Sequence, residues 1–215
     1  MMVKICGLST LEATEVAIEA GADALGFVLA PSPRQVTLEK ARELLAIVPE
    51  HIETVGVFAK ATREELEAAD EVGFRALQRE FGSPSIKLRN GSFALSVWRD
   101  GEDLEQRIEE HDQEDAARGS YSPGSLRGAL VLDGPKGGGQ GVPVDLERAR
   151  RIAHARPIIL AGGLTPENVA ERIHAVAPIA VDTSSGVEKE RGIKDPKRIR
   201  AFIQNARSAF EKRLR

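Results

Sequence analysis

This chain of 215 residues has little cysteine and few aromatic residues: one Cys, one Trp, one Tyr and seven Phe. A single cysteine excludes an internal disulfide framework and fits a reducing compartment. No apolar run approaches the ~18 residues that a membrane-spanning helix needs. The first residues, MMVKICG, lead directly into a strand-like run, so we see no signal peptide. We therefore expect a cytoplasmic protein that does not act at a membrane.

Concentrated positive charge is also missing. The formal net charge is −3, with 30 Lys and Arg against 33 Asp and Glu, which argues against nucleic acid as a partner. Hydrophobic residues make up 41% and charged residues 29%, as in an ordinary globular protein. No Pro- or Gly-rich linker divides the chain, so we expect one domain over residues 1–215.

Eight short apolar runs alternate with longer amphipathic segments, a pattern typical of βαβ units and a parallel sheet. Two of these segments begin with the spacing of a capping box, Ser9 with Glu12 and Thr62 with Glu65. Eight units in a chain this short favour a (β/α)8 barrel over an open sheet with an extra domain. The apolar runs are residues 2–6, 24–29, 54–59, 75–78, 92–98, 128–133, 157–163 and 178–185.

Two segments depart from a regular barrel. The connection between the fourth and fifth runs is short, which predicts a stunted or irregular fourth βα unit. Nine acidic residues lie between Asp100 and Asp115. We interpret this segment as a solvated fifth helix rather than an interaction tail.

In such a barrel the active site lies at the carboxyl ends of the strands. None of the four histidines falls at an expected strand end, so a histidine is not the expected proton-transfer group. Cys6 and Asp133 are the most suggestive residues at these ends, and Trp98 is the expected end of the fifth strand. Cys6 could instead be an inert core residue, and Asp133 a turn or helix-cap aspartate.

Two expected strand ends lack bulky side chains. Gly162 and Gly163 follow the seventh strand, and Ser185 and Gly186 follow the eighth. In (β/α)8 barrels the loops after these two strands commonly hold phosphate through backbone N–H groups. Glycine in either loop could serve turn geometry alone, but the pair together predicts a phosphate site.

Several segments resemble the phosphoribosylanthranilate isomerase family of tryptophan biosynthesis. They are VKICGLSTLEATEVAIEAGADALGFVLAPSPRQV, VGVFA, VLDGPKGGGQG, ILAGGLTPENV and VDTSSGVEKERGIKD. The resemblance is weakest between Phe74 and Arg127. It implies a (β/α)8 aldose–ketose isomerase that performs an Amadori rearrangement on a phosphosugar without a cofactor or metal, as a monomer or homodimer.

By position, the resemblance implies roles for eight residues. Cys6 would be the general base and Asp133 the general acid. Arg34 would bind the anthranilate carboxylate, and Asp182 would line the site. Gly162, Gly163, Ser185 and Gly186 would hold the phosphate. Taken alone, Arg34 could also be an exposed loop residue.

A thiol acts as a base when nearby positive charge lowers its pKa. Lys4 lies one inward-facing position below Cys6, so we expect Lys4 to lower the pKa of the thiol, unless it only pairs with Asp182. We expect burial or a second carboxylate to raise the pKa of Asp133. The chain departs from the family at Glu80, where many members have a histidine. The resemblance therefore does not predict how the pocket wall is formed at this position.

Three other functions compete with this interpretation. The related aminoaldose isomerase of histidine biosynthesis uses an aspartate at the end of the first strand, where this chain has Cys6. Indole-glycerol-phosphate synthase needs lysines at strand ends, but Lys136 lies on a glycine-rich loop and Lys4 lies too deep. A phosphate-binding barrel that has lost catalysis is favoured only by the altered fourth unit.

Overall fold

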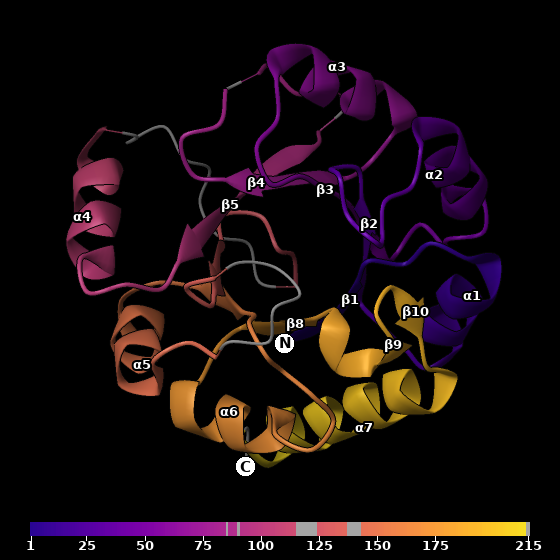
Figure 1. Cartoon of the computed structure of the whole chain (residues 1–215). Coiled ribbons are helices and arrows are strands. Elements are labelled where there is room, and N and C mark those ends of the chain that lie inside the picture. The colour runs from indigo at the N-terminus through magenta and orange to yellow at the C-terminus, as the bar shows by residue number, and fades with distance from the viewer. Residues whose placement is uncertain (85, 90, 115–123, 137–142, 214–215) are drawn as a thin grey trace.

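In the computed structural model, eight parallel strands follow one another around a closed barrel, and helices surround it (Figure 1). The structure describes residues 1–84, 86–89, 91–114, 124–136 and 143–213. The first strand pairs with both the second and the eighth, which closes the ring and confirms the expected fold. The strands are β1 (Met2–Cys6), β2 (Ala24–Val28), β3 (Glu53–Val57), β4 (Ala76–Glu80), β5 (Phe93–Arg99), β6 (Leu130–Asp133), β7 (Ile158–Leu160) and β8 (Ala180–Thr183).

The helices alternate with these strands except after β4. Residues 81–92 contain no helix in the part that the structure describes, which confirms the irregular fourth unit. The acidic segment forms α4, as expected, although Asp115 lies outside the described residues. The helices are α1 (Leu11–Glu19), α2 (Leu38–Leu45), α3 (Arg63–Val72), α4 (Leu104–Glu114), α5 (Leu146–Ala155), α6 (Val169–Val176) and α7 (Pro196–Arg213).

The two expected capping boxes have different outcomes. At α3, the Thr62 side chain accepts from the Glu65 N–H and the Glu65 carboxylate accepts from the Thr62 N–H, so this capping box is confirmed. At α1, the N-cap is Thr10 rather than Ser9. The Thr10 hydroxyl accepts from the Ala13 N–H at 3.2 Å, so the helix begins one position later than the spacing predicts.

Alternation along the strands divides the core into two layers. Inward-facing residues such as Val55, Leu95 and Val131 fill the barrel, while outward-facing residues pack under the helices. Trp98 is 1% exposed and belongs to the outer layer, so its expected place at a strand end in the site is wrong. Strand β5 continues one residue further, and Arg99 faces the interior there.

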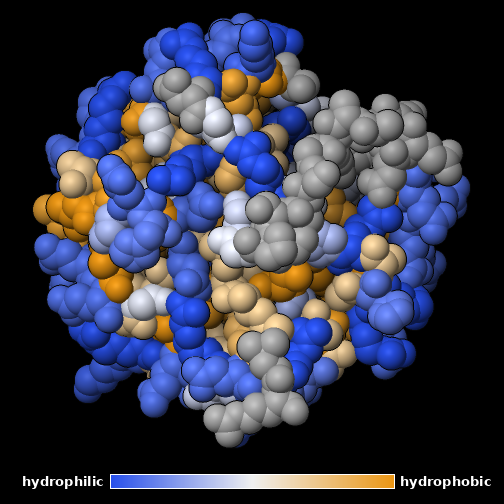
Figure 2. Space-filling view, turned by 180° about the vertical axis from the view of Figure 1, so that it is seen from behind, coloured by the Kyte–Doolittle hydropathy of each residue, from blue (hydrophilic) through white to orange (hydrophobic). Residues whose placement is uncertain are grey.

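The opposite face of the molecule is shown in Figure 2. Apolar surface lies near the middle of this face, and hydrophilic side chains form most of the rim. None of the helices within the described ranges is both long and apolar enough to cross a membrane.

Candidate active site

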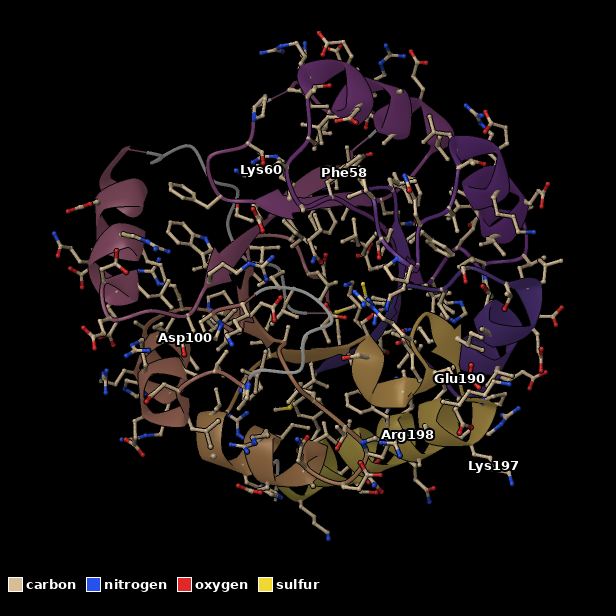
Figure 3. All side chains as sticks on the ribbon, viewed as in Figure 1. Phe58, Lys60, Asp100, Glu190, Lys197 and Arg198 are labelled. Carbon is tan, nitrogen blue, oxygen red and sulfur yellow. The ribbon has the colours of Figure 1, made fainter. Side chains whose placement is uncertain are left out.

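One cavity of about 270 Å³ opens at the carboxyl ends of the strands. Figure 3 shows side chains around this central region, with Phe58, just after β3, among those labelled. The structure brings all eight residues singled out from the sequence to the wall of this cavity, although they come from distant parts of the chain. They are Cys6, Arg34, Asp133, Gly162, Gly163, Asp182, Ser185 and Gly186.

Lys4 and Asp182 form a buried ion pair at the base of the cavity. The two residues lie opposite each other in the β1–β8 register, and both face inward. Lys4 is fully buried, and its Nζ donates to Asp182 Oδ2 at 2.8 Å and to Gln78 Oε1 at 3.1 Å. Burial disfavours the ammonium charge, but Asp182 and Cys6 outweigh it and raise the pKa of Lys4. The pairing considered from the sequence is therefore present.

Cys6 lies one inward-facing position above Lys4 and is 6% exposed. Its neighbour on β2 is Gly26, where a Cβ atom would lie 2.8 Å from the Cys6 sulfur, so glycine provides the space for the thiol. Burial raises the pKa of Cys6, although the charge of Lys4 works in the opposite direction. The expected lowering of this pKa is wrong, because desolvation outweighs the nearby cations.

Asp133 is the last residue of β6 and is largely buried. Its Oδ1 accepts from the Gly134 N–H at 2.8 Å, and its Oδ2 accepts from Arg99 Nη1. Burial raises the pKa of Asp133 despite the opposing charge of Arg99, which confirms the expected direction. Residues 137–142 of the glycine-rich stretch that follows lie outside the described part of the chain.

The loops after β7 and β8 present backbone toward the cavity. Gly162 and Gly163 both have positive φ, 80° and 67°, and neither donates its N–H to an acceptor within the described ranges. After β8 a 3-10 turn, η1 (Ser185–Val187), packs so closely that a Cβ atom on Gly186 would lie 1.8 Å from the Leu164 oxygen. Arg198 on α7 donates to the Gly186 oxygen at 3.0 Å and so ties this turn to the last helix (Figure 3).

The charged segment after η1 folds back as a two-stranded hairpin, β9 (Glu188–Glu190) with β10 (Ile193–Lys194). Glu188 accepts from Arg34 Nε at 2.6 Å and from Arg34 Nη2 at 2.8 Å, and also from Lys194 Nζ at 2.9 Å. Burial alone would raise the pKa of Glu188, but Arg34 and Lys194 outweigh it and lower this pKa to about 2. The hairpin therefore fixes the guanidinium that faces the cavity.

Sequence reasoning missed Glu188, Lys194 and Arg99. The first two lie in a run of charge that is typical of a solvated loop, and only the fold shows that the run buries two of its members. Arg99 could have been found from its spacing, because Val97 and Arg99 lie on the same side of β5.

We expect Glu188→Gln to lower the free energy of unfolding at pH 7 by roughly 3 kcal/mol, because it leaves Arg34 and Lys194 without their buried counter-charge. The folded pKa of Glu188 is depressed, so its contribution is present above about pH 4.5 and is lost as the pH falls through about 2. Urea unfolding at a series of pH values should show the difference from wild type shrinking over that range. Glu190→Gln, an exposed carboxylate of the same hairpin, is the matched control. A difference that stayed constant down to pH 2 would contradict this account.

Comparison with known proteins gives a consistent result. The family model described as N-(5'phosphoribosyl)anthranilate (PRA) isomerase matches residues 3–78 and 104–205. An N-(5'-phosphoribosyl)anthranilate isomerase of Streptococcus pneumoniae is 40% identical over 211 residues, 98% of each chain.

Solved structures give the same family. A phosphoribosyl anthranilate isomerase in complex with reduced 1-(o-carboxyphenylamino)-1-deoxyribulose 5-phosphate is 31% identical, with a TM-score of 0.78 over 97% of this chain and 99% of that one. The isomerase from Thermotoga maritima is 33% identical, with a TM-score of 0.81 over the same shares. Both the sequence and the barrel therefore show that this chain belongs to the N-(5'-phosphoribosyl)anthranilate isomerase family.

Proposed function

We propose that this chain catalyses the Amadori rearrangement of N-(5'-phosphoribosyl)anthranilate in tryptophan biosynthesis, with Asp133 as general acid and Cys6 as general base. The observation that carries the assignment is the order of the strands around one cavity. Asp133 ends β6 and Cys6 ends β1, so the two groups flank the glycine-rich ends of β7 and β8. A ribose held there by its 5'-phosphate has one group on each side.

In the first step, Asp133 donates its proton to the ring oxygen of the ribose. The bond between C1 and this oxygen breaks, and the nitrogen lone pair forms a C1–N double bond, giving a protonated Schiff base. The raised pKa of Asp133 supports this role because it increases the protonated fraction of the carboxyl group at a given pH.

In the second step, the Cys6 thiolate removes the proton from C2, which the Schiff base has made acidic. The electron pair of the C2–H bond forms a C1–C2 double bond, and the positive nitrogen is neutralised as an enolamine. Protonation at C1 and loss of the hydroxyl proton at C2 give the 1-amino-1-deoxyketose. The buried cation Lys4, below Cys6, supports formation of the thiolate against the cost of burial.

Binding uses the two ends of the substrate. The Gly162–Gly163 and Ser185–Gly186 backbones receive the phosphate. Glu188 holds Arg34 through Nε and Nη2, which directs the Nη1 side of the guanidinium to the anthranilate carboxylate. Asp182, paired with Lys4, forms the floor of the site.

The relative that is solved with a reduced deoxyribulose 5-phosphate analogue supports a phosphosugar substrate. We propose that the chain works in the cytoplasm as a single catalytic domain over residues 1–215. A solved relative from Thermotoga maritima is described as dimeric, and we propose a monomer or homodimer for this chain.

A coupled assay tests the function. Phosphoribosylanthranilate is generated enzymatically from anthranilate, and its fluorescence is followed after this protein is added. We expect a decay much faster than spontaneous hydrolysis, with the deoxyribulose phosphate as product. Decay at the spontaneous rate would overturn the proposal, and decay of the histidine-pathway aminoaldose alone would favour the related isomerase.

A further inference from the structure

Arg99 joins two carboxylates across three neighbouring strands. Its Nη1 donates to Asp133 Oδ2 on β6, and its Nη2 donates to Glu80 Oε1 on β4 at 2.8 Å. The register places Arg99 beside Asp133 and Glu80 beside Val97, so the three side chains converge at one edge of the cavity. One guanidinium charge is therefore shared between an inward-facing acid and a second carboxylate.

This arrangement bears directly on proton donation. A general acid must carry a proton, but hydrogen-bond donors on both carboxylate oxygens favour its ionised form. Asp133 accepts from Gly134 on one oxygen and from Arg99 on the other. Burial favours the protonated form of Asp133 and outweighs these two donors, so the pKa of Asp133 is raised.

The other charges around Asp133 act from further away. Asp182 on β8 raises the pKa of Asp133, but it is itself paired with Lys4 of β1. Among the described residues, Arg99 is the cation that donates a hydrogen bond to Asp133. The other carboxylate that accepts from Arg99 is that of Glu80. The remaining ionisable residues of the cavity wall are Cys6 of β1 and, from the loops, Arg34 and Arg191.

We propose that Arg99 is a positioning residue for Asp133, and that Glu80 takes up part of the Arg99 charge so that Asp133 can hold the proton used in ring opening. The proposal rests on the function proposed above. It also gives a role to Glu80, the position where this chain departs from the histidine of many family members.

The two side chains should have opposite effects. Removing Arg99 takes away both a donor and a positive charge, so the Asp133 carboxylate is less stable and its pKa rises. Neutralising Glu80 leaves the full guanidinium charge facing Asp133, so the pKa of Asp133 falls. A merely structural pair would not produce shifts of opposite sign.

The test is a ¹³C NMR titration of the Asp133 carboxyl group in the ligand-free protein, with Asp133→Asn to assign the signal. We expect the midpoint to rise by about one pH unit or more in Arg99→Gln and to fall in Glu80→Gln. Arg99→Lys keeps the charge and should restore most of the wild-type midpoint. The exposed pair of Arg151 and Glu105 provides matched controls, Arg151→Gln and Glu105→Gln, with no change expected.

Kinetics give a second readout. The inflection of kcat/KM that belongs to Asp133 should move in the same direction as its NMR midpoint in each variant. An unchanged midpoint in Arg99→Gln, or shifts of the same sign in Arg99→Gln and Glu80→Gln, would overturn the proposal. The titration needs no turnover, so this failure is distinct from a failure of the wild-type protein to isomerise phosphoribosylanthranilate.

Discussion

Asp133→Asn is expected to lower kcat by about 10²–10⁴-fold while substrate binding changes little. The amide keeps the shape of the carboxyl group, and its one oxygen can still accept from the Gly134 N–H, while its NH2 group takes the place of the oxygen that accepts from Arg99. It cannot donate a proton to the ring oxygen. Phosphate and carboxylate recognition lie at other residues, so the affinity for the substrate should remain. Turnover is measured in the coupled assay, and binding with the reduced deoxyribulose phosphate analogue that a solved relative binds.

The matched control for this substitution is Asp145→Asn. Asp145 is the exposed N-cap of α5, where asparagine caps about as well as aspartate, and it is outside the cavity wall. Its kcat should equal that of the wild type. Loss of analogue binding in Asp133→Asn in proportion to the loss of turnover would contradict a role in proton donation.

Cys6→Ala should cause a loss of similar size, about 10²–10⁴-fold in kcat, because the alanine variant has no group to take the proton from C2. Cys6→Ser fits the same space beside Gly26 but has a far less acidic hydroxyl, so it should rescue little activity. Because the pKa of Cys6 is raised, the thiolate fraction, and with it alkylation of this single cysteine by iodoacetamide, should increase at a higher pH than it does for an exposed cysteine.

Binding again separates a chemical role from a structural one. Cys6→Ala and Cys6→Ser should both hold the reduced analogue about as tightly as the wild type does, and their thermal unfolding should be similar. Turnover by Cys6→Ser at the wild-type rate would contradict the role of the Cys6 thiolate as the general base.

The barrel and most of the wall of the site could be predicted because parallel strands impose simple rules. Alternation puts Cys6 and Asp133 on the inner side of their strands, and closure of the ring brings their ends to one cavity. Strand ends were harder to predict. The apolar run stops at Trp98, but β5 continues to Arg99, which pairs with Asp133. Alternation along the strand then points Trp98 toward the helices and Arg99 into the barrel.

Other features depend on contacts between distant parts of the chain. No local pattern shows that Glu188 will meet Arg34, 154 positions earlier, or that the side chains of Glu188 and Lys194 will be buried while the rest of their hairpin is mostly exposed. The shift in the pKa of Cys6 is a balance between desolvation and the charges of nearby residues. The direction of this shift depends on how the chain packs around the thiol rather than on the neighbouring sequence. The N-cap of α1 is Thr10 rather than Ser9, although the spacing of Ser9 and Glu12 alone favours Ser9.

The pairing of β1 with β8 has a consequence for how the chain folds while it is being synthesised. Lys4 pairs with Asp182, which lies 178 positions further along the chain. During synthesis on the ribosome, β1 therefore has one unpaired edge until β8 emerges. The barrel cannot close, and the charged lysine cannot be neutralised in its interior, before almost all of the polypeptide has been made. Assembly of the nascent enzyme is therefore a late, long-range event, and a chain cut short before β8 would be a substrate for chaperones and proteases rather than a slower isomerase.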